Sequence, residues 1–136
     1  MRRLTMGAIR NKNVKPLKLL IVDDEAGFAD ILSKRLTKRG MITVKANSGV
    51  EAIQSLRKSD FDLAVLDLKM ENMNGIETLQ IFKNIVPDMP VIMLTGHGCE
   101  ESAKEGLASG ADDYLIKPCN LEELINKIYS VTSNKG

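Results

Sequence analysis

Cysteine is scarce in this chain of 136 residues, and long hydrophobic runs are missing. Cys99 and Cys119 do not make a disulfide framework or a metal-binding pattern, so we expect a reduced protein in which both are small packing residues. No stretch approaches the roughly 20 apolar residues of a membrane span. The basic start at residues 1–3 is not followed by the apolar segment that a signal peptide needs. These absences argue against a secreted scaffold and a membrane span, and they favour a cytoplasmic location.

Nucleotide-binding loops and histidine clusters are missing as well. The chain has no Walker-type Gly-Lys-Ser/Thr sequence, and Gly96-His97-Gly98 is too short to form a phosphate-binding loop. His97 is the sole histidine. We interpret it as a loop residue, not as a phosphohistidine or a catalytic base.

Acidic residues are absent from the first 18 positions, which hold six lysines and arginines. The net charge of +1 therefore divides into +6 for this stretch and −5 for the remainder. A basic arm could bind nucleic acid or a membrane surface, but this one lacks aromatic residues and apolar periodicity. We expect a flexible arm at residues 1–16, one domain at residues 17–132 without direct contact to nucleic acid, and a tail at residues 133–136.

Five short stretches predict β-strands. Residues 17–22, 63–67 and 90–95 each contain an apolar run, at 19–22, 63–66 and 90–94, which indicates strands covered on both faces, as in the middle of a parallel sheet. Residues 41–46 alternate apolar and polar side chains, which is typical of an edge strand. The short stretch at 113–117 predicts a second edge strand.

Helical patterns separate these strands. The first helix is expected to bury Phe28, Ile31, Leu32 and Leu36 and to end at Gly40. Capping pairs begin three later helices: Ser48 with Glu51, Asn74 with Glu77, and Asn120 with Glu123. Residues 99–109 predict a weakly anchored, mobile helix, because its apolar face is small and Gly106 costs about 1 kcal/mol relative to alanine. Five alternating strands and helices predict an α/β fold with a parallel sheet and right-handed connections.

Polar side chains stand where the predicted strands end. Asp23 and Asp24 follow the first strand, Asp67 ends the third, Thr95 ends the fourth and Lys117 ends the fifth. The carboxyl ends of parallel strands share one edge, where open α/β sheets bind ligands. Neighbouring strands lie about 4.8 Å apart, so Asp24 and Asp67 can share a cation if their strands are adjacent. We identify Asp67 as a candidate phosphoryl acceptor.

Three carboxylates at one edge would repel one another and resist ionisation. A hard divalent cation relieves this repulsion, and Mg²⁺ suits a site that also holds phosphate oxygens. Lys117 adds a further positive charge and Thr95 a hydroxyl donor. Phosphoryl transfer depends mainly on positioning and charge neutralisation, so this set of groups is chemically sufficient for it.

The motifs resemble those of a response-regulator receiver domain of the chemotaxis type, over residues 17–132. The residues that carry the resemblance are Asp23-Asp24, Asp67-Leu68-Lys69-Met70 with Asn74-Gly75, Leu94-Thr95-Gly96, Gly110-Ala111-Asp112-Asp113-Tyr114, and Lys117-Pro118. Each motif alone is a weak signal, but five in this order are highly specific. The resemblance implies a flavodoxin-like (βα)5 domain with a doubly wound sheet of strand order 2-1-3-4-5, which agrees with the edge and central strands expected above.

The resemblance also implies a role for each site residue. Asp67 would accept a phosphoryl group from a phosphohistidine on a sensor histidine kinase or a phosphotransfer protein. Mg²⁺ would be bound directly by Asp24, Asp67 and the backbone carbonyl of Lys69, and through water by Asp23.

The resemblance also implies roles for two residue pairs, Thr95 with Tyr114 and Lys117 with Pro118. Thr95 and Tyr114 match the family's switch pair, in which the hydroxyl moves to the phosphoryl group and the ring turns inward. Lys117 would assist catalysis, and Lys117-Pro118 matches a position where the peptide bond is usually cis. Two departures affect kinetics in an unknown direction: Glu71 stands where proline is common, and Lys69 and His97 occupy variable positions.

The implied activity is that of a phosphorylation-controlled switch that assists its own phosphorylation and dephosphorylation, not of a metabolic enzyme. Phosphorylation would bias the fourth helix, fifth strand and fifth helix, the face expected to contact a target protein or output domain. A phosphorylation-dependent homodimer, and a stand-alone protein or a piece of a larger regulator, stay open.

Two alternatives remain. The first is a binding module of the same fold that ignores phosphorylation. The second is an aspartate-nucleophile phosphatase, a class that usually has a second Asp two residues after the nucleophile, where this chain has Lys69.

Overall fold

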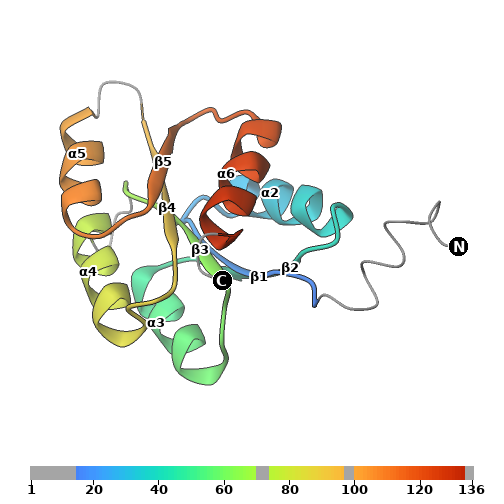
Figure 1. Cartoon of the computed structure of the whole chain (residues 1–136), viewed down its shortest axis with the longest axis horizontal. Coiled ribbons are helices and arrows are strands. Elements are labelled where there is room, and N and C mark those ends of the chain that lie inside the picture. Colours follow the sequence, from blue (N-terminus) through green and yellow to red (C-terminus); the bar gives the residue numbers. More distant parts are fainter. Residues whose placement is uncertain (1–14, 70–73, 97–99, 134–136) are drawn as a thin grey trace, which may run out of the picture.

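The computed structural model describes residues 15–69, 74–96 and 100–133. Strands and helices alternate along them in the order β1 (Lys18–Val22), α2 (Ala26–Lys38), β2 (Ile42–Ala46), α3 (Gly49–Lys58), β3 (Leu63–Asp67), α4 (Gly75–Ile85), β4 (Val91–Thr95), α5 (Glu100–Ala108), β5 (Asp113–Ile116) and α6 (Leu121–Ser133). The strands form one parallel sheet of order β2-β1-β3-β4-β5 (Figure 1). The flavodoxin-like α/β fold and its strand order are therefore confirmed.

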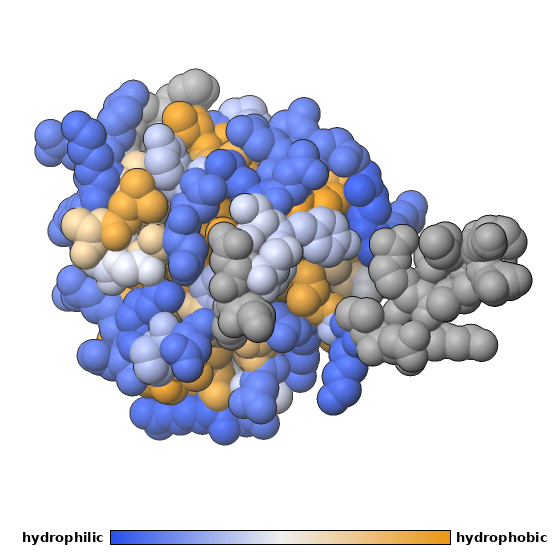
Figure 2. Space-filling model, viewed as in Figure 1, coloured by the Kyte–Doolittle hydropathy of each residue, from blue (hydrophilic) through white to orange (hydrophobic). Residues whose placement is uncertain are grey.

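Helices cover both faces of the sheet. One core joins α2 and α6 to side chains such as Leu19 and Val65, and the other joins α3 and α4 to alternate residues such as Leu20 and Leu66. Figure 1 shows α2 and α6 on one side and α3, α4 and α5 on the other. Figure 2 shows that the outer surface of the view is largely hydrophilic, with hydrophobic patches between. This double cover explains why the strands predicted as central are continuously apolar.

Burial along the strands matches the expected positions. Every residue of β3 and β4 is buried, whereas β2 and β5 at the edges are only partly covered. The predicted N-cap residues each accept a hydrogen bond from a helix N–H, although the partner of Asn74 is Ile76 and not the expected Glu77. Ser48 accepts a hydrogen bond from the Glu51 N–H, Asn74 from the Ile76 N–H and Asn120 from the Glu123 N–H.

The predicted inner face of the first helix was wrong at Ile31, whose surface is 57% exposed. The buried residues of α2 are Ala29, Leu32 and Leu36. At about 100° per residue, Ile31 points roughly 200° away from Ala29 and so lies on the outer side of the helix. The three-residue spacing between Phe28 and Ile31 is typical of one helix face, but the buried face of α2 is centred on Ala29, Leu32 and Leu36.

Gly106 has a packing role that the sequence does not reveal. It is buried in α5, and a Cβ at this position would lie 2.0 Å from the sulfur of Met93 on β4. The glycine therefore lets α5 approach the sheet closely. The expected mobility of this helix stays a prediction.

Several expectations fall outside the described residues: most of the basic arm, Met70, Glu71, His97, Cys99 and residues 134–136. Within the described ranges, no helix combines the length and the apolar character needed to cross a membrane.

Candidate functional site

The carboxyl edge of the sheet gathers buried polar side chains. In the described part of the chain, the buried polar or charged residues are Asp23, Asp67, Thr78 and Thr95. Three of these four stand where β1, β3 and β4 end. Burying such groups costs free energy unless they are paired, so their concentration at one edge indicates a functional site.

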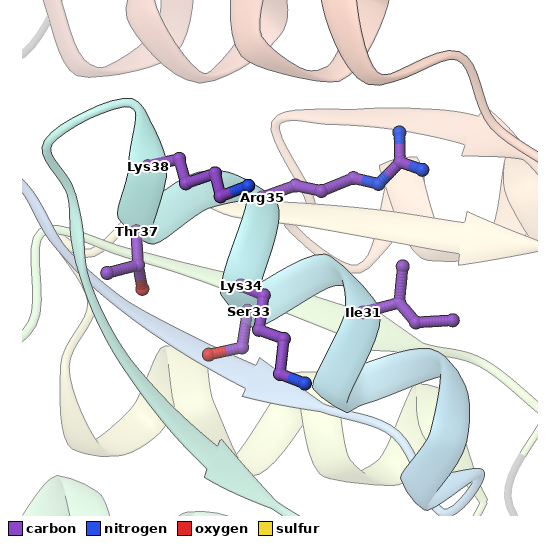
Figure 3. A pocket seen from close by; sticks show the side chains of 6 residues that line it. All are labelled: Ile31, Ser33, Lys34, Arg35, Thr37 and Lys38. Atoms are coloured by element: carbon purple, nitrogen blue, oxygen red, sulfur yellow. The ribbon is translucent and has the colours of Figure 1, made fainter.

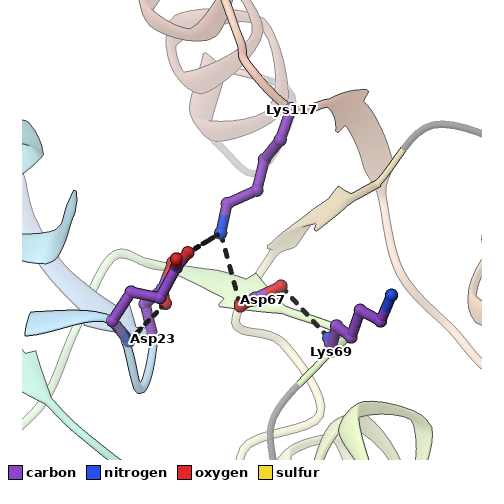
Figure 4. Close-up of polar contacts among 5 residues, drawn as sticks. Asp23, Asp67, Lys69 and Lys117 are labelled. Carbon is purple, nitrogen blue, oxygen red and sulfur yellow. Dashed lines mark hydrogen bonds and ion pairs between the residues drawn. The ribbon is translucent and has the colours of Figure 1, made fainter.

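Lys117 closes this site from the end of β5. Its Nζ lies 3.0 Å from Asp23 Oδ2, 3.1 Å from Glu25 Oε1 and 3.4 Å from Asp67 Oδ2. Figure 4 shows its side chain extending toward Asp23 and Asp67. The ammonium also lies 4.4 Å from the centre of the Phe28 ring. The Lys117 ammonium thus joins three acids that are distant from it in sequence. Asp23 and Glu25 are 94 and 92 residues away, and Asp67 lies on the central strand β3.

The Asp67 carboxyl has a raised pKa. Burial raises its pKa to about 6, and the nearby Asp23 charge acts in the same direction. A hydrogen bond of 3.1 Å from the Lys69 N–H to Oδ1 and the Lys117 ammonium act in the opposite direction and do not cancel the rise. A buried carboxylate at this pKa is ionised at neutral pH and is available as a nucleophile.

Lys117 stays charged in this environment. Burial alone would lower its pKa, but hydrogen bonds to Asp23 and Glu25 and the charge of Asp67 raise the pKa above its ordinary value. A permanently charged ammonium beside Asp67 suits the neutralisation of phosphoryl oxygens.

Carboxylate oxygens of Asp23, Glu25 and Asp67 lie within 4.8 Å of one another, and this group could hold a metal ion. Among the described residues, Lys117 supplies the one ammonium in contact with all three acids, and an all-oxygen donor set with excess negative charge fits Mg²⁺. Asp24, expected as a direct ligand, is partly buried at the same strand end but is not in this group. The direct and water-mediated roles assigned to Asp24, Asp23 and Lys69 stay predictions.

Leu68, directly after β3, lies close to the start of α4. A Cβ on Gly75 would lie 2.4 Å from the Cα of Leu68, so only glycine fits between the helix and the strand end. Asn74 caps the same helix start through the Ile76 N–H. These contacts fix the backbone directly after Asp67.

Thr95 and Tyr114, the residues predicted to form a switch pair, lie on the neighbouring strands β4 and β5. Asp67 pairs in register with Leu94, which places Thr95 one residue beyond at the same edge. Tyr114 on β5 is partly buried against the core beneath α3 and α4. The Lys117 N–H donates to the Thr95 carbonyl at 2.6 Å, and the Lys117-Pro118 bond is cis, as the resemblance implied.

Sequence reasoning missed Glu25 and Phe28 as parts of the site. Glu25 was visible as the third acid in Asp23-Asp24-Glu25, but its contact with Lys117 depends on how α2 begins. Phe28 was assigned to the core because of its helical spacing. No local signal shows that its ring also faces the ammonium.

A separate groove of about 420 Å³ runs along α2 (Figure 3). It is lined by Ile31, Ser33, Lys34, Arg35, Thr37 and Lys38. It contains no acid or nucleophile of the Asp67 site, so the two features are distinct.

Comparison with known proteins agrees with this geometry. The family model of the response regulator receiver domain matches residues 19–129. Transcriptional regulatory protein ZraR of Klebsiella oxytoca is 40% identical over 106 residues, which are 78% of this chain and 24% of that protein. The CpxR homolog of Haemophilus influenzae is 43% identical over 114 residues, 84% of this chain and 49% of that protein. The chain thus spans about a quarter to a half of these curated relatives.

Solved structures show the same similarity. The receiver domain of the Francisella response regulator 1452 superposes with a TM-score of 0.81 at 32% identity, covering 88% of this chain and 99% of that one. A CheY-like receiver domain protein of Methanospirillum hungatei gives 0.84 at 30% identity, covering 89% and 97%. With the family model spanning most of its length, the chain belongs to the receiver domains of two-component response regulators.

Proposed function

We propose that Asp67 accepts a phosphoryl group from a phosphohistidine on a sensor histidine kinase or phosphotransfer protein, in a reaction that needs Mg²⁺. The observation that carries this proposal is the Lys117 ammonium, which contacts Asp23 and Asp67 from two different strands in one buried site. The match to the receiver family supports the same reading.

The chain's own groups account for the transfer. A carboxylate oxygen of Asp67 forms the new O–P bond while the P–N bond to the donor imidazole breaks, and the bonding electron pair stays on that nitrogen. Lys117 neutralises charge on the transferred oxygens, and the Thr95 hydroxyl donates a hydrogen bond to one of them. Asp23, Asp24, Asp67 and the Lys69 carbonyl would hold Mg²⁺, which supplies further neutralisation of the phosphoryl charge.

The output of this reaction is a change in partner binding through α5, β5 and α6. Leu107 on α5, Ile116 on β5 and Tyr129 on α6 are exposed apolar side chains on these three elements. Thr95 and Tyr114 connect the acceptor edge to this face, because β4 and β5 pair directly. A downstream target or an output domain, or a second copy of the chain, would dock there.

Beryllofluoride, which mimics an aspartyl phosphate, tests the proposal. With Mg²⁺ it should shift the amide NMR resonances of Thr95 and of residues 100–117. Asp67→Asn should abolish both these shifts and the incorporation of label from acetyl phosphate. Asp88→Asn, an exposed acid in the loop after α4, is the matched control and should behave as the wild type.

Shifts that persist in Asp67→Asn would show that the acceptor is another residue. Absence of label in the wild type with Mg²⁺ present would favour a phosphorylation-independent binding module. Steady turnover of an added phosphomonoester would favour a phosphatase.

A further inference from the structure

Lys117 makes more contacts than a phosphoryl transfer requires. Its ammonium lies closer to Asp23 and to Glu25, at 3.0 and 3.1 Å, than to Asp67, at 3.4 Å. The ammonium also makes a cation–π contact with the Phe28 ring of α2. An ammonium has three donors, so the described contacts with three carboxylates already engage them.

Glu25 is placed at the start of α2 without capping it. It occupies the N-cap position, but its side chain accepts no capping hydrogen bond from the helix. Its backbone N–H instead donates to Asp23 Oδ1 at 2.9 Å, which turns the chain so that its carboxylate meets Lys117. The side chain is 68% exposed, so burial in the core does not account for its position either.

We propose that Glu25 is a positioning residue that holds Lys117 toward α2 and thereby slows phosphorylation of Asp67. The inference rests on the proposed function and adds regulation of the same site. An incoming phosphoryl group needs the Lys117 ammonium as a partner, and the Glu25 carboxylate competes for it. Removing that competitor frees one charge-assisted hydrogen bond for the phosphoryl oxygens.

A role as a metal ligand makes the opposite prediction. The Glu25 carboxylate belongs to the acidic group that could hold a cation. If it bound Mg²⁺, its loss would weaken Mg²⁺ binding and slow the reaction. The sign of the kinetic effect therefore separates the two roles.

The test compares the full wild-type chain with Glu25→Gln, using acetyl phosphate and a series of Mg²⁺ concentrations. At saturating Mg²⁺ the initial rate of Asp67 labelling should rise about twofold to fivefold, the size expected for releasing one ion pair whose acid is largely exposed. The Mg²⁺ concentration for half-maximal rate should stay unchanged. Asp88→Asn removes one carboxylate charge from an exposed position in the loop after α4, away from the site and from the α5-β5-α6 face, and should leave the rate at the wild-type value.

A second readout needs neither Mg²⁺ nor phosphate. In Glu25→Gln the Lys117 Nζ resonance should shift and its protons should exchange faster with water, because the ammonium loses a charged acceptor. Phe28→Leu, which removes the ring but keeps an apolar side chain, should shift the same resonance. An unchanged Nζ signal in Glu25→Gln would overturn the inference.

The kinetic outcomes are equally decisive. Slower labelling, or a higher Mg²⁺ requirement in Glu25→Gln, would overturn the inference and favour the metal-ligand role. Labelling of the wild type with no acceleration in Glu25→Gln would overturn the inference while leaving the proposed function intact. No labelling of either protein would overturn the proposed function itself.

Discussion

The Asp67 carboxyl lies where its neutral form is favoured. Its surface is 3% exposed, and burial raises its pKa from 3.8 to about 6. Between these two pH values the folded protein binds a proton that the unfolded chain has released. The free energy of unfolding therefore falls as pH rises through this window, and above about pH 6 the full cost of burying the charge is present.

Asp67→Asn should consequently stabilise the protein at pH 7.5 in the absence of Mg²⁺. The shift in pKa corresponds to a gain on the order of 1–3 kcal/mol in the free energy of unfolding, because the amide carries no charge. The gain should shrink toward pH 4, where the wild-type carboxyl is protonated in the fold. Urea denaturation in EDTA at both pH values measures it, with Asp88→Asn as the control. A variant less stable than the wild type at pH 7.5 would contradict this account of Asp67.

Residue positions in the site could be predicted from sequence only where a strand fixes them. Asp67, Thr95 and Lys117 stand at or directly after strand ends, and parallel pairing carries strand ends to one edge. Glu25 and Phe28 lie just before and on a helix, and their contact with Lys117 depends on the angle at which α2 leaves the sheet. Sequence periodicity does not encode that angle.

The packing of α5 at Gly106 could not be predicted from the sequence either. Helix propensity treats this glycine as a defect, but a Cβ there would lie 2.0 Å from the buried Met93 sulfur. The apolar runs of β3 and β4 predicted buried central strands, yet no local pattern shows how closely α5 packs on β4. The distance between α5 and β4 depends on the side chains of both elements, whereas a hydrophobic pattern describes one element at a time.

Gly106→Ala should therefore destabilise the protein by about 1 kcal/mol, because the flexible Met93 side chain is fully buried and has to repack around the new methyl group, which outweighs the better helix propensity. Gly27→Ala is the matched control. Gly27 lies in α2, and nothing lies within 4 Å of a Cβ added there, so that variant should gain roughly 0.5–1 kcal/mol. Urea denaturation compares the two.

A shorter side chain at position 93 tests whether the contact with Met93 causes the loss of stability in Gly106→Ala. Met93→Val shortens the side chain that the new methyl group meets, so the double variant should lose less stability than the sum of the single variants. A Gly106→Ala protein more stable than the wild type would show that α5 shifts outward at little cost.

The whole molecule consists of two cores that share one sheet. Leu19 and Ile21 of β1 face α2 and α6, whereas Leu20 and Val22 of the same strand face the core of α3 and α4. The central and edge strands could be predicted because continuous apolar runs mark the strands covered on both faces, whereas the full strand order followed only from the resemblance to receiver domains. The same feature couples the two cores, since a strand cannot leave one without exposing the other.

Unfolding should accordingly be a single transition for both faces. Phe82 of α4 and Ile128 of α6 are fully buried on opposite sides of the sheet. Phe82→Leu and Ile128→Val should each cost about 0.5–1.5 kcal/mol. In a urea titration followed by amide NMR, Phe82→Leu should lower the midpoint of α2 and α6 resonances as much as that of α3 and α4. Ile128→Val should lower the urea midpoint of the α3 and α4 resonances as much as that of the α2 and α6 resonances. If either variant lowers the midpoint on one face of the sheet alone, the two cores do not unfold as one cooperative unit.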